Sequence, residues 1–522
     1  MTDITEVIGV CEWVAKRTTD FSAKVYKDGD RVYAVDSDGK TIAEGEAGVD
    51  DASVIQAALD VCGKVFIAKG EYICEALDPP ANCEIIGEGR DITILKLPFT
   101  ATNPIIKPSS TKSNIHIYGM TLDGSNVSGV DIAGNAGGSG WHVSHVKFTN
   151  AGRHAFWLGA GSYKTIIEKC IIDTCGIHGI QTSSTPSQEV IIQDLRIYNT
   201  NDSALHIYIK NSQVKNIIAT NCCGVVDIVE AEGCIIDGVI GIRCDGTVFV
   251  EEGSVAGQNC IIDNIYAYRC GSNYYSILIS GTGHKIGKIT VIEHQSSDRC
   301  AVALNGKKLT VDSITVINSL GDGIVLGNPS EECSINTVYV EGCANNGLTI
   351  WRSEKHQILG GVIKNTENYG LYINAWEGCR RNLIQGLRIF DDQDTPTQQY
   401  GIYIIGPYVN KTTIRDCKVW NNVAQDVYVD SSVTEEITWE NVEGYTTENG
   451  GTATFSGDGS TTQFSIEHGL VSTPSKVQVT AMSEDASGDF YVTADATYIY
   501  VNYKTAPPSG TDNIKLSWSA EV

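Results

Sequence analysis

The chain has 522 residues, of which 42% are hydrophobic, with 53 glycines and 12 prolines, a composition typical of an ordered, turn-rich β protein. Its formal net charge of −25 at pH 7 excludes sequence-independent nucleic-acid binding, which needs a basic surface. No run approaches the roughly 18 apolar residues of a membrane span, and the first residues lack the basic and apolar regions of a secretory signal, so we expect neither membrane insertion nor a signal peptide.

Residues 1–46 are expected to form a small N-terminal head. Strand-like alternation and turn dipeptides occur within FSAKVYKDGDRVYAVDSDGKTIAEG, which begins at Phe21. This pattern predicts two or three antiparallel strands. Such a segment would serve as a head or as an oligomer contact.

A short amphipathic helix is predicted next, within VDDASVIQAALDVC. Asp50 or Asp51 can cap its N-terminus. The apolar face of the helix would consist of Val54, Ile55, Ala58 and Leu59. Because the terminal unit of a solenoid has to cover the open end of the core, we expect this helix to cap the repeats that follow.

The stretch from Asn114 to about Gly444 repeats one pattern at intervals of roughly 25 residues. Each unit holds short runs of alternating β-branched residues that end in Asn, Asp, Gly or Cys, as in TIIEKCIIDTCG and CIIDNIYAYRCG. Short strands broken by small polar corners, without a helical period, predict an all-β fold. We expect a right-handed, single-stranded parallel β-helix of about fourteen coils over residues 47–445, on the order of 65 Å long.

The chain has seventeen cysteines, most of which recur at equivalent positions of these coils. Some open their strands and others lie at corners, among them Cys175, Cys234, Cys244, Cys260, Cys270, Cys333 and Cys343. Side chains at equivalent positions of successive coils stack in ladders, and in a ladder Cys acts as a small, easily buried residue. We therefore expect mostly free thiols, as in a protein made in a reducing compartment, with some disulfide bridges as the alternative.

Residues 446–522 depart from the repeat and predict a separate C-terminal β-sandwich. A Gly-, Thr- and Ser-rich linker, GYTTENGGTATFSGDGSTTQ, leads into it. The alternating segments QFSIEHGL, SKVQVTAMS, DFYVTAD, TYIYVNYKTAP and NIKLSWSAEV would be its antiparallel strands. Either trimer locking or carbohydrate binding would suit such a module.

Outward residues on about four central coils form the first candidate site. Side chains of a β-helix alternate between core and surface, so the coils can be aligned on their inward aliphatic residues. The candidate catalytic carboxylates are Asp202, Asp227, Glu230 and Glu251. The candidate substrate-binding residues around them are Trp157, His178, His206, Tyr208 and Lys210.

The spacing of the coils suits glycosidic chemistry at these carboxylates. Equivalent side chains lie about 5 Å apart on adjacent coils and about 10 Å apart two coils away. These distances bracket the carboxyl separations of retaining and inverting glycosidases. Stacked like charges would also raise the pKa of one carboxyl and so place an acid beside a base. A solvated acidic flank on an acidic protein is the alternative interpretation.

A second outward patch is aromatic and lies on later coils. Its substrate-binding candidates are Trp351, Tyr372, Asn374, Trp376 and Tyr403. Exposed aromatic rings on a rigid sheet suit stacking against sugar rings, while amide and charged groups contact the hydroxyls. The alternative is aromatic packing between the chains of an oligomer.

Residues from about 48 to 100 closely resemble the entry region of a known superfamily, and the coils up to 444 resemble it by their pattern. Residues 50–96 contain D-D-x-x-x-I-Q-A-A-L-D, then G-K-V-F-I-A-K-G-E-Y-I, then I-I-G-E-G-R-D-I-T-I-L-K. This order resembles the pectate-lyase-like parallel β-helix superfamily, most of all its phage tailspikes and polysaccharide depolymerases. The C-terminal segments are similar to small modules of phage tail fibres. The resemblance implies a homotrimer on a virion tail or outside the cell, which binds polysaccharide and contacts a tail or baseplate protein through its head.

A weaker resemblance concerns the chemistry. The segment NTNDSALHIYIK, which contains Asp202, is similar to the D-D-C-I-A-I-K strand of polygalacturonase-type hydrolases. Asn201 stands where that family has its first Asp, and the G-H-G of the next coil is missing.

These observations predict a tailspike-like depolymerase that binds and hydrolyses a cell-surface polysaccharide with Asp and Glu residues and needs no cofactor or metal. A polysaccharide lyase or epimerase is the alternative enzyme, and it would need a base and a cation such as Ca²⁺ at the uronate carboxylate. The sequence contains no GGxGxD calcium repeat. A non-catalytic glycan-binding adhesin or receptor-binding fibre is the third possibility.

Overall fold

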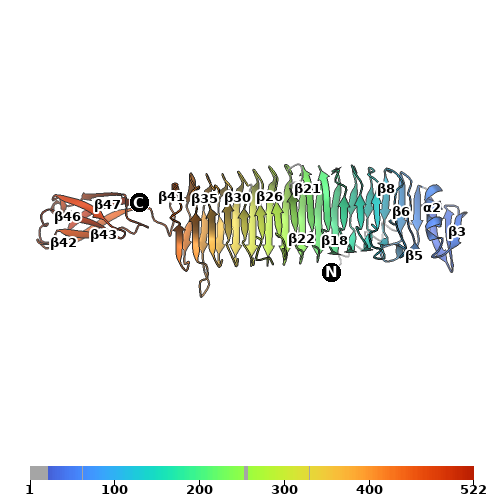
Figure 1. Ribbon diagram of the computed structural model, residues 1–522, viewed down its shortest axis with the longest axis horizontal. Coiled ribbons are helices and arrows are strands. Elements are labelled where there is room, and N and C mark those ends of the chain that lie inside the picture. Colours follow the sequence, from blue (N-terminus) through green and yellow to red (C-terminus); the bar gives the residue numbers. More distant parts are fainter. Residues whose placement is uncertain (1–20, 62, 252–256, 328–329) are drawn as a thin grey trace.

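The computed structural model describes residues 21–61, 63–251, 257–327 and 330–522, and it shows a long rod of stacked coils (Figure 1). A helix and three strands lie at the N-terminal end of the rod, and a separate β module lies beyond the other end. Of the helices in these ranges, none is long and apolar enough to cross a membrane. The predicted parallel β-helix with C-terminal antiparallel sheets is confirmed.

The N-terminal strands are hydrogen-bonded to the rod. β1 (Ala23–Asp28), β2 (Arg31–Asp36) and β3 (Thr41–Glu46) pair with one another in antiparallel order. β1 also pairs in parallel with β4 (Lys64–Ile67), which belongs to the first coil. Residues 21–46 thus extend a sheet of the β-helix, while residues 1–20 of the predicted head lie outside the described residues.

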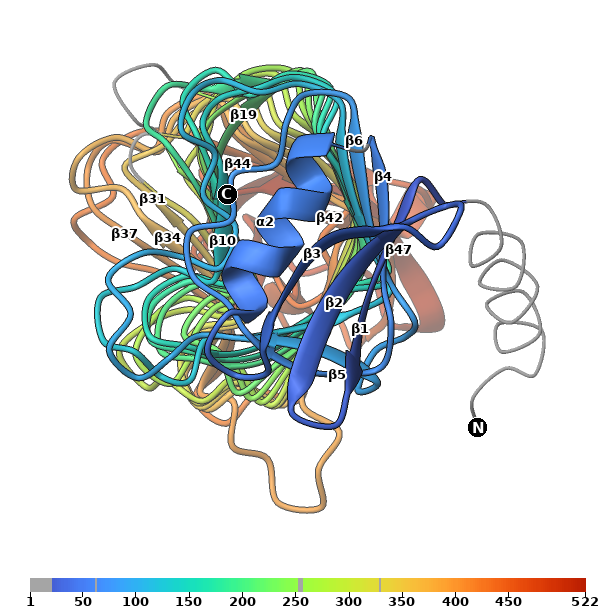
Figure 2. The ribbon, with the colours of Figure 1, turned by 90° about the vertical axis from the view of Figure 1, so that its right-hand side faces the viewer.

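Helix α2 (Asp51–Val61) lies across the N-terminal end of the coils (Figure 2). The fully buried Asp51 carboxylate accepts hydrogen bonds from Lys27 Nζ at 2.8 Å and from the Ile73 amide at 2.7 Å. The Asp50 carboxylate accepts one from the Glu46 amide at 2.8 Å. The helix therefore caps the core, and its predicted apolar face is confirmed as buried at Val54, Ile55, Ala58 and Leu59.

Sheet A, the larger sheet of the rod, holds in each coil either two short strands or one long strand. Besides β1–β4 it contains β5 (Gly70–Ile73), β6 (Cys83–Gly87), β7 (Thr93–Lys96), β8 (Ile115–Tyr118), β9 (Thr121–Asp123), β11 (His142–Ser144), β12 (Lys147–Ala151), β14 (Ile166–Glu168), β15 (Ile171–Cys175), β18 (Ile191–Thr200), β20 (Gln213–Thr220), β22 (Ile235–Ile242), β24 (Ile261–Tyr268), β26 (Lys285–Ile292), β28 (Thr310–Ile317), β30 (Ser334–Glu341), β32 (Gln357–Ile358), β33 (Gly361–Lys364), β35 (Leu383–Gln385), β36 (Leu387–Phe390), β38 (Thr412–Arg415), β39 (Lys418–Trp420) and β41 (Ile437–Glu440).

Sheet B lies on another side of the coils and carries the candidate site. Its strands pair in parallel from one coil to the next. They are β10 (Ala133–Asn135), β13 (Phe156–Leu158), β16 (Ile180–Thr182), β17 (Ser187–Gln188), β19 (Leu205–Lys210), β21 (Val226–Glu232), β23 (Val248–Glu251), β25 (Ile277–Ile279), β27 (Val302–Leu304), β29 (Ile324–Leu326), β31 (Leu348–Trp351), β34 (Tyr369–Asn374), β37 (Tyr400–Ile405) and β40 (Gln425–Val429).

The core of the rod follows the alternation of the sequence. Each buried aliphatic side chain contributes about 1.5–3 kcal/mol by leaving water, so a column of them stabilises every coil. The sequence alternation places fourteen residues of sheet B at inward positions, and none of them has exposed surface: Phe156, Leu158, Leu205, Ile207, Val226, Ile228, Val248, Val250, Leu348, Ile350, Leu371, Ile373, Ile402 and Ile404. With the inward positions fixed in this way, the residues between them face outward.

Asparagine side chains close several corners between strands. Asn199 and Asn221 have left-handed backbones, with φ of 54° and 55°, which Asn tolerates better than most residues. Asn221 Nδ2 donates to Asn199 Oδ1 at 3.4 Å, and Asn199 Nδ2 donates to Asp173 Oδ1 at 3.1 Å. These amides satisfy one another along the rod, which explains why Asn recurs at the corners of the repeat.

Every cysteine within the described residues is free, and all of them except Cys223 are buried. Several thiols donate to main-chain carbonyls, as Cys234 Sγ does to Ile209 O at 3.4 Å. The prediction of mostly free thiols at ladder positions is confirmed for this part of the chain.

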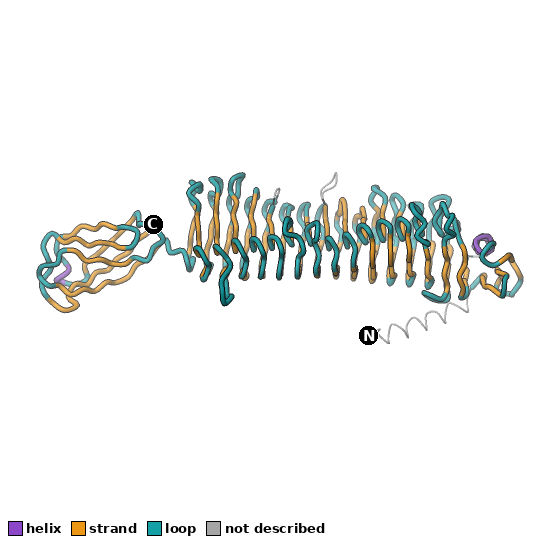
Figure 3. The backbone as a smooth tube through the Cα atoms, turned by 60° about the horizontal axis from the view of Figure 1, so that its bottom comes forward, coloured by secondary structure: helices purple, strands orange, loops and turns teal. Residues whose placement is uncertain are grey.

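The C-terminal module consists of two three-stranded antiparallel sheets, visible beyond the coils in Figure 3. One sheet holds β42 (Glu448–Gly457), β44 (Lys476–Ala481) and β47 (Gly510–Glu521). The other holds β43 (Gln463–Glu467), β45 (Phe490–Ala494) and β46 (Tyr498–Tyr503), and a 3₁₀ turn, η1 (Glu484–Ala486), lies between β44 and β45. Both sheets bury side chains in one shared core, including Phe464, Ile499, Val501, Ile514 and Leu516.

Candidate functional site

One line of outward residues, the outward column, runs along sheet B and includes residues from both candidate patches. The parallel register places one member of the column on each coil. In order these members are Gly134, Trp157, Gln181, His206, Asp227, Phe249, Leu278, Ala303, Val325, Thr349, Tyr372, Tyr403 and Tyr428. Asp227 and Tyr372 are six coils apart, which corresponds to about 29 Å.

Three histidines on successive coils form a stack beside this column. The rings of His154 and His178 are parallel within 2°, with centroids 5.2 Å apart. The rings of His178 and His206 are 4.9 Å apart and inclined by 12°. His154 and His178 precede their strands by two residues, whereas His206 lies within β19. The stack therefore begins at the corner beside the outward column and ends on the column itself, at His206. We call His154, His178 and His206 the histidine stack.

Two of the predicted carboxylates contact the histidine stack. Asp227 Oδ2 lies 2.6 Å from Nδ1 of His206, and Asp202 Oδ1 lies 4.0 Å from Nδ1 of His178. The carboxylate of Asp227 is 16% exposed and that of Asp202 is 53% exposed. Because a carboxylate accepts, Nδ1 of His206 carries the proton, and Nε2 of the neutral ring is left as its basic atom.

Burial keeps the inner part of the stack neutral. Burial, followed by the positive charges of His178, Arg153 and His206, lowers the pKa of His154 to about 3. Burial also lowers the pKa of His178, although Asp202 opposes this effect. The His178 amide donates to Nδ1 of His154 at 3.3 Å, so the proton of neutral His154 is on Nε2. His154 and His178 are therefore uncharged imidazoles at neutral pH.

Replacing His154 should reduce the loss of folding free energy that the protein shows as the pH is lowered. The folded-state pKa of His154 lies below its unfolded value of about 6.5, so only the unfolded chain takes up this proton as the pH falls. The stability that the neutral, buried His154 contributes is present in full above about pH 6.5 and is lost as the pH falls from there to about 3. The His154→Gln variant keeps an acceptor for the His178 amide but cannot titrate. Urea unfolding across this pH range should show a smaller loss of stability for His154→Gln than for the wild type, and equal losses would contradict the assignment.

Aromatic and cationic groups surround the stack. The Trp157 ring lies 5.7 Å from that of His154, and the Arg153 guanidinium lies 5.3 Å from the indole centroid. Tyr208 meets His206 edge to face at 5.7 Å. These contacts place Trp157, His178, His206 and Tyr208 in one cluster, as the alignment of the coils predicted.

The other predicted residues of this patch lie further along the strands. Lys210 forms an ion pair with Glu232 at 2.9 Å, and this hydrogen bond, with help from Glu230, raises the pKa of Lys210. Glu230 lies at the irregular register between β19 and β21, with φ of 60°. Glu251 ends β23, and its side chain lies outside the described residues.

Two charged residues of this cluster were not singled out from the sequence. Asp131 precedes β10, accepts a hydrogen bond from the His154 amide at 3.2 Å and lies 3.8 Å from Nε of Arg153. Burial raises the pKa of Asp131, and Arg153 opposes that shift. Both residues lie at corners, shortly before a strand whose alternate residues point inward. This position is the only signal that the sequence gives for them.

The second patch is built around a tyrosine cluster of Tyr369, Tyr372, Tyr400, Tyr403 and Tyr428. Tyr369 and Tyr403 stack at 4.4 Å, and Tyr403 and Tyr428 stack at 5.0 Å. Burial and the neighbouring tyrosines raise the pKa of Tyr403 to about 12. The amide of Asn374 donates to the hydroxyl of Tyr372 at 3.1 Å. The predicted Tyr372, Asn374 and Tyr403 thus lie together.

Two tryptophans and a partly buried acid border the tyrosine cluster. Trp351 is 37% exposed and Trp376 is 51% exposed, and the guanidinium of Arg352 lies 4.6 Å from the Trp351 ring while it pairs with Glu377. Asp322 accepts a hydrogen bond from the Thr349 hydroxyl at 3.0 Å, and burial raises the pKa of Asp322. The sequence pattern had not indicated Asp322.

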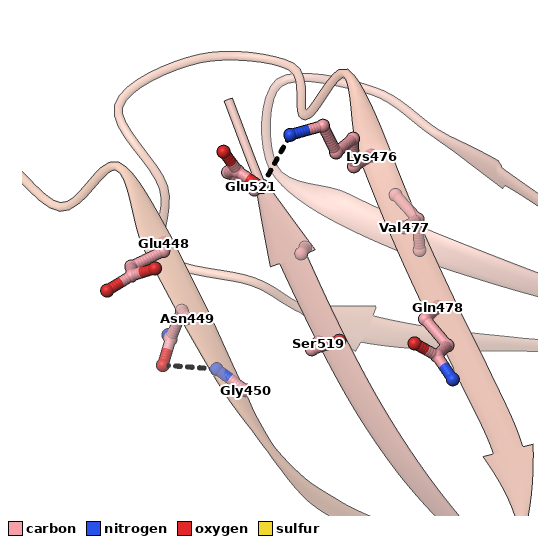
Figure 4. Close-up of a pocket in the computed structure, with 9 residues that line it drawn as sticks. Glu448, Asn449, Gly450, Lys476, Val477, Gln478, Ser519 and Glu521 are labelled. Carbon is pink, nitrogen blue, oxygen red and sulfur yellow. Dashed lines mark hydrogen bonds and ion pairs between the residues drawn. The ribbon is translucent and has the colours of Figure 1, made fainter.

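A hollow lies on the C-terminal module (Figure 4). It encloses about 720 Å³ between β42, β47 and β44. Lys476 pairs with Glu521 across it at 2.9 Å, and Glu448, Asn449 and Gln478 also line it. Its nine lining residues include no aromatic side chain, so it lacks a platform for sugar stacking.

No group of three or more His, Cys, Asp or Glu side chains that could hold a metal ion is found within the described ranges.

Comparisons with known proteins show what the fold of this chain is similar to. Residues 276–443 match the family model described as right handed beta helix region, whereas no curated protein matches the chain. Among solved structures, the chain is similar to the A-module of the mannuronan C-5 epimerase AlgE6 of Azotobacter vinelandii, at 14% identity over 76% of this chain and 96% of that one, with a TM-score of 0.36.

Two further structures are similar at comparable levels. A tailspike protein mutant of E. coli bacteriophage HK620, in complex with a pentasaccharide, is 13% identical over 94% of this chain and 92% of that one, with a TM-score of 0.44. The GH87 alpha-1,3-glucanase of Streptomyces thermodiastaticus strain HF3-3 is 12% identical over 76% and 67%, with a TM-score of 0.38. The family model and the parallel register of the coils together confirm the right-handed parallel β-helix to which the sequence pointed.

Proposed function

We propose that this chain is a tailspike-like depolymerase that binds a cell-surface polysaccharide along the outward column of sheet B and hydrolyses it at the histidine stack. The observation that carries this proposal is the placement of Asp202 and Asp227 on adjacent coils, in contact with His178 and His206 at 4.0 and 2.6 Å. Two carboxyl groups that flank one position are what glycoside hydrolysis needs.

The outward column supplies a rigid track for a linear polymer. Trp157 lies two coils before His206, and the tyrosine cluster begins six coils after Asp227. Aromatic rings offer apolar faces for the C–H side of sugar rings, and they need little ordering on a β-helix because their strands are already fixed. The two patches therefore act as two binding sites at different positions along the outward column.

The proposed chemistry gives the two carboxyl groups different roles. Asp227, which lies 2.6 Å from Nδ1 of His206, takes a proton from the attacking water. That water forms a bond to the anomeric carbon as the glycosidic C–O bond breaks, and Asp202 gives its proton to the leaving oxygen. Asp202 lies four residues before His206, the register partner of Asp227, so the two carboxyl groups are offset along the strand direction as well as by one coil. We therefore expect the separation of about 6.5–9.5 Å that inverting enzymes use.

β-Elimination or epimerisation of a uronate is the second candidate, because the 2.6 Å contact between His206 and Asp227 also suits an oriented base. Nε2 of His206 would remove the proton next to the uronate carboxylate. The positive charge of Arg153 is nearby, although it faces Asp131. This second candidate requires an anionic polysaccharide.

Product analysis separates these functions. The wild-type protein is incubated with purified polysaccharide from the host cell surface, and the products are followed by a reducing-end assay, by ultraviolet absorbance and by NMR of the anomeric protons. We expect new reducing ends of inverted configuration and no absorbance from unsaturated uronates. Unsaturated products would establish elimination instead, and binding without any product would establish an adhesin.

We also propose that the protein works as a homotrimer on a virion tail, with the N-terminal segment as its contact to a tail or baseplate protein. Light scattering should then give three times the chain mass of 56.3 kDa. A monomeric mass would refute this assembly.

A further inference from the structure

A small hollow lies at the N-terminal end of the outward column, outside the catalytic contacts. It encloses about 120 Å³ in front of Trp157, and Lys107, Pro108, Asp131 and Gly134 also line it. A water molecule takes about 30 Å³ in the liquid, so the hollow has room for one small ring and not for an oligosaccharide.

Gly134 keeps this hollow open. It occupies the outward column one coil before Trp157, in direct register with it. A Cβ atom at this position would lie 2.9 Å from the carbonyl oxygen and 3.1 Å from the Cβ of Trp157. Any larger residue would therefore push into the space beside the tryptophan, whereas glycine leaves it clear.

The hollow combines a polar wall with a fixed floor. Asp131 Oδ1 is engaged by the His154 amide and by Arg153, and no partner of Asp131 Oδ2 is seen in the part of the chain that the structure describes. In the floor, Asn135 Oδ1 accepts hydrogen bonds from the Gly159 amide at 2.7 Å and from the Ser162 hydroxyl at 3.0 Å. These bonds hold β10 and the loop after β13 together, so binding here would order little additional structure.

We propose that this hollow is a binding subsite for one neutral hexopyranose ring of the polymer, stacked on Trp157 and hydrogen-bonded to Asp131. The proposal rests on the proposed function, since it assigns this ring to the same polysaccharide. Hydroxyl groups donate well to a carboxylate, and such charge-assisted bonds are stronger than neutral ones. A uronate would place its own negative charge against Asp131. Arg153 pairs with Asp131 and lies 5.3 Å from the Trp157 centroid, and Lys107 Nζ donates to Asn103 Oδ1, so both cations already have partners in the protein.

The position of this subsite sets the path of the polymer along the rod. Trp157 lies two coils, or about 10 Å, before His206. The polysaccharide would extend from the hollow, past the histidine stack, toward the tyrosine cluster. The identity of the first ring would then be selected by Gly134 and Asp131, which have no part in the cleavage chemistry.

Saturation-transfer difference NMR tests the subsite with defined sugars. The neutral probes are D-glucose, D-galactose, D-mannose and N-acetyl-D-glucosamine, and the anionic probes are D-glucuronate and D-galacturonate. At least one neutral sugar should bind the wild-type protein better than either uronate. Trp157→Ala and Gly134→Val should weaken that binding about tenfold. Asp131→Asn keeps an acceptor for the His154 amide and should weaken it less. Gly360→Ala is the matched control, because its Cβ would meet no atom closer than 3.8 Å.

The outcomes are decisive in both directions. Circular dichroism checks that each variant is folded, and Trp157→Ala decides alone if Gly134→Val does not fold. Binding of none of the neutral sugars, preference for a uronate, or unchanged binding by Trp157→Ala would overturn the subsite. Polysaccharide cleavage is measured in parallel. Cleavage without ring binding would refute the subsite alone, and ring binding without cleavage would refute the proposed hydrolysis alone.

Discussion

Asp227→Asn is expected to lower kcat for polysaccharide cleavage by about 10²–10⁴-fold, the usual contribution of a positioned acid or base. The amide keeps the size of the side chain and can still accept from His206, but it cannot take a proton from water. Because the removed interaction acts in the transition state, KM should change little. Reducing-end kinetics on the purified polysaccharide, together with a binding assay, measure both quantities.

Asp394→Asn is the matched control for this experiment. Asp394 is exposed in the loop between β36 and β37, outside the outward column, and its replacement makes the same change in charge. Its kcat and KM should equal those of the wild type. An Asp227→Asn protein that cleaves as fast as the control would remove Asp227 from the mechanism, and a loss of binding would show that Asp227 holds the substrate instead.

Phe156→Ala is expected to destabilise the protein by about 3–5 kcal/mol, the usual cost of emptying a large buried site. Phe156 has no exposed surface, and its ring lies 6.4 Å from Trp141 and 6.1 Å from Phe148. It is also the inward neighbour of Trp157 on β13, so the cavity would loosen the strand that carries the sugar platform. Urea unfolding gives the change in stability, and hydrogen exchange shows where the coils open.

Phe99→Ala is the control for this variant, because Phe99 is 82% exposed. Its free energy of unfolding should stay within about 0.5 kcal/mol of the wild type. Each coil of a solenoid contacts only its neighbours, so faster exchange in the Phe156→Ala protein should be concentrated near β10, β13 and β16. An equal urea midpoint for Phe156→Ala and Phe99→Ala would show that the core relaxes around the lost ring.

The fold could be predicted because one physical rule is repeated many times. Inward aliphatic residues and small polar corners fixed both the coil period and the buried faces, and Val226, Ile228, Leu371 and Ile373 are buried as expected. The pairing of β1 with β4 was not predicted, because the N-terminal strands occur once and carry no repeat that reveals their partner.

The candidate site could be predicted only in part. Alternation within strands identified Trp157, His206, Asp227, Tyr372 and Tyr403, since an outward residue between two inward ones has a defined direction. Corners vary in length and conformation, so alternation does not determine which corner side chains meet.

Corner residues of the two patches show this limit. Asp131 and Arg153 lie at corners, and their contact with each other and with the histidine stack depends on backbone turns that the pattern does not encode. Tyr369 and Tyr400 are the first residues of β34 and β37, two positions before the first inward residue of each strand. The segment Tyr-Gly-Leu-Tyr in one coil and Tyr-Gly-Ile-Tyr in the next carried a signal for the tyrosine cluster, because equal patterns on adjacent coils stack.

The most direct test of this account is a crystal structure of the Asp227→Asn protein with an oligosaccharide prepared from the target polysaccharide. We predict that the sugar lies along the outward column of sheet B, with one ring on Trp157 and a glycosidic oxygen beside Asp202, above the histidine stack. An oligosaccharide bound on sheet A, or on the C-terminal module with an empty outward column, would contradict the account.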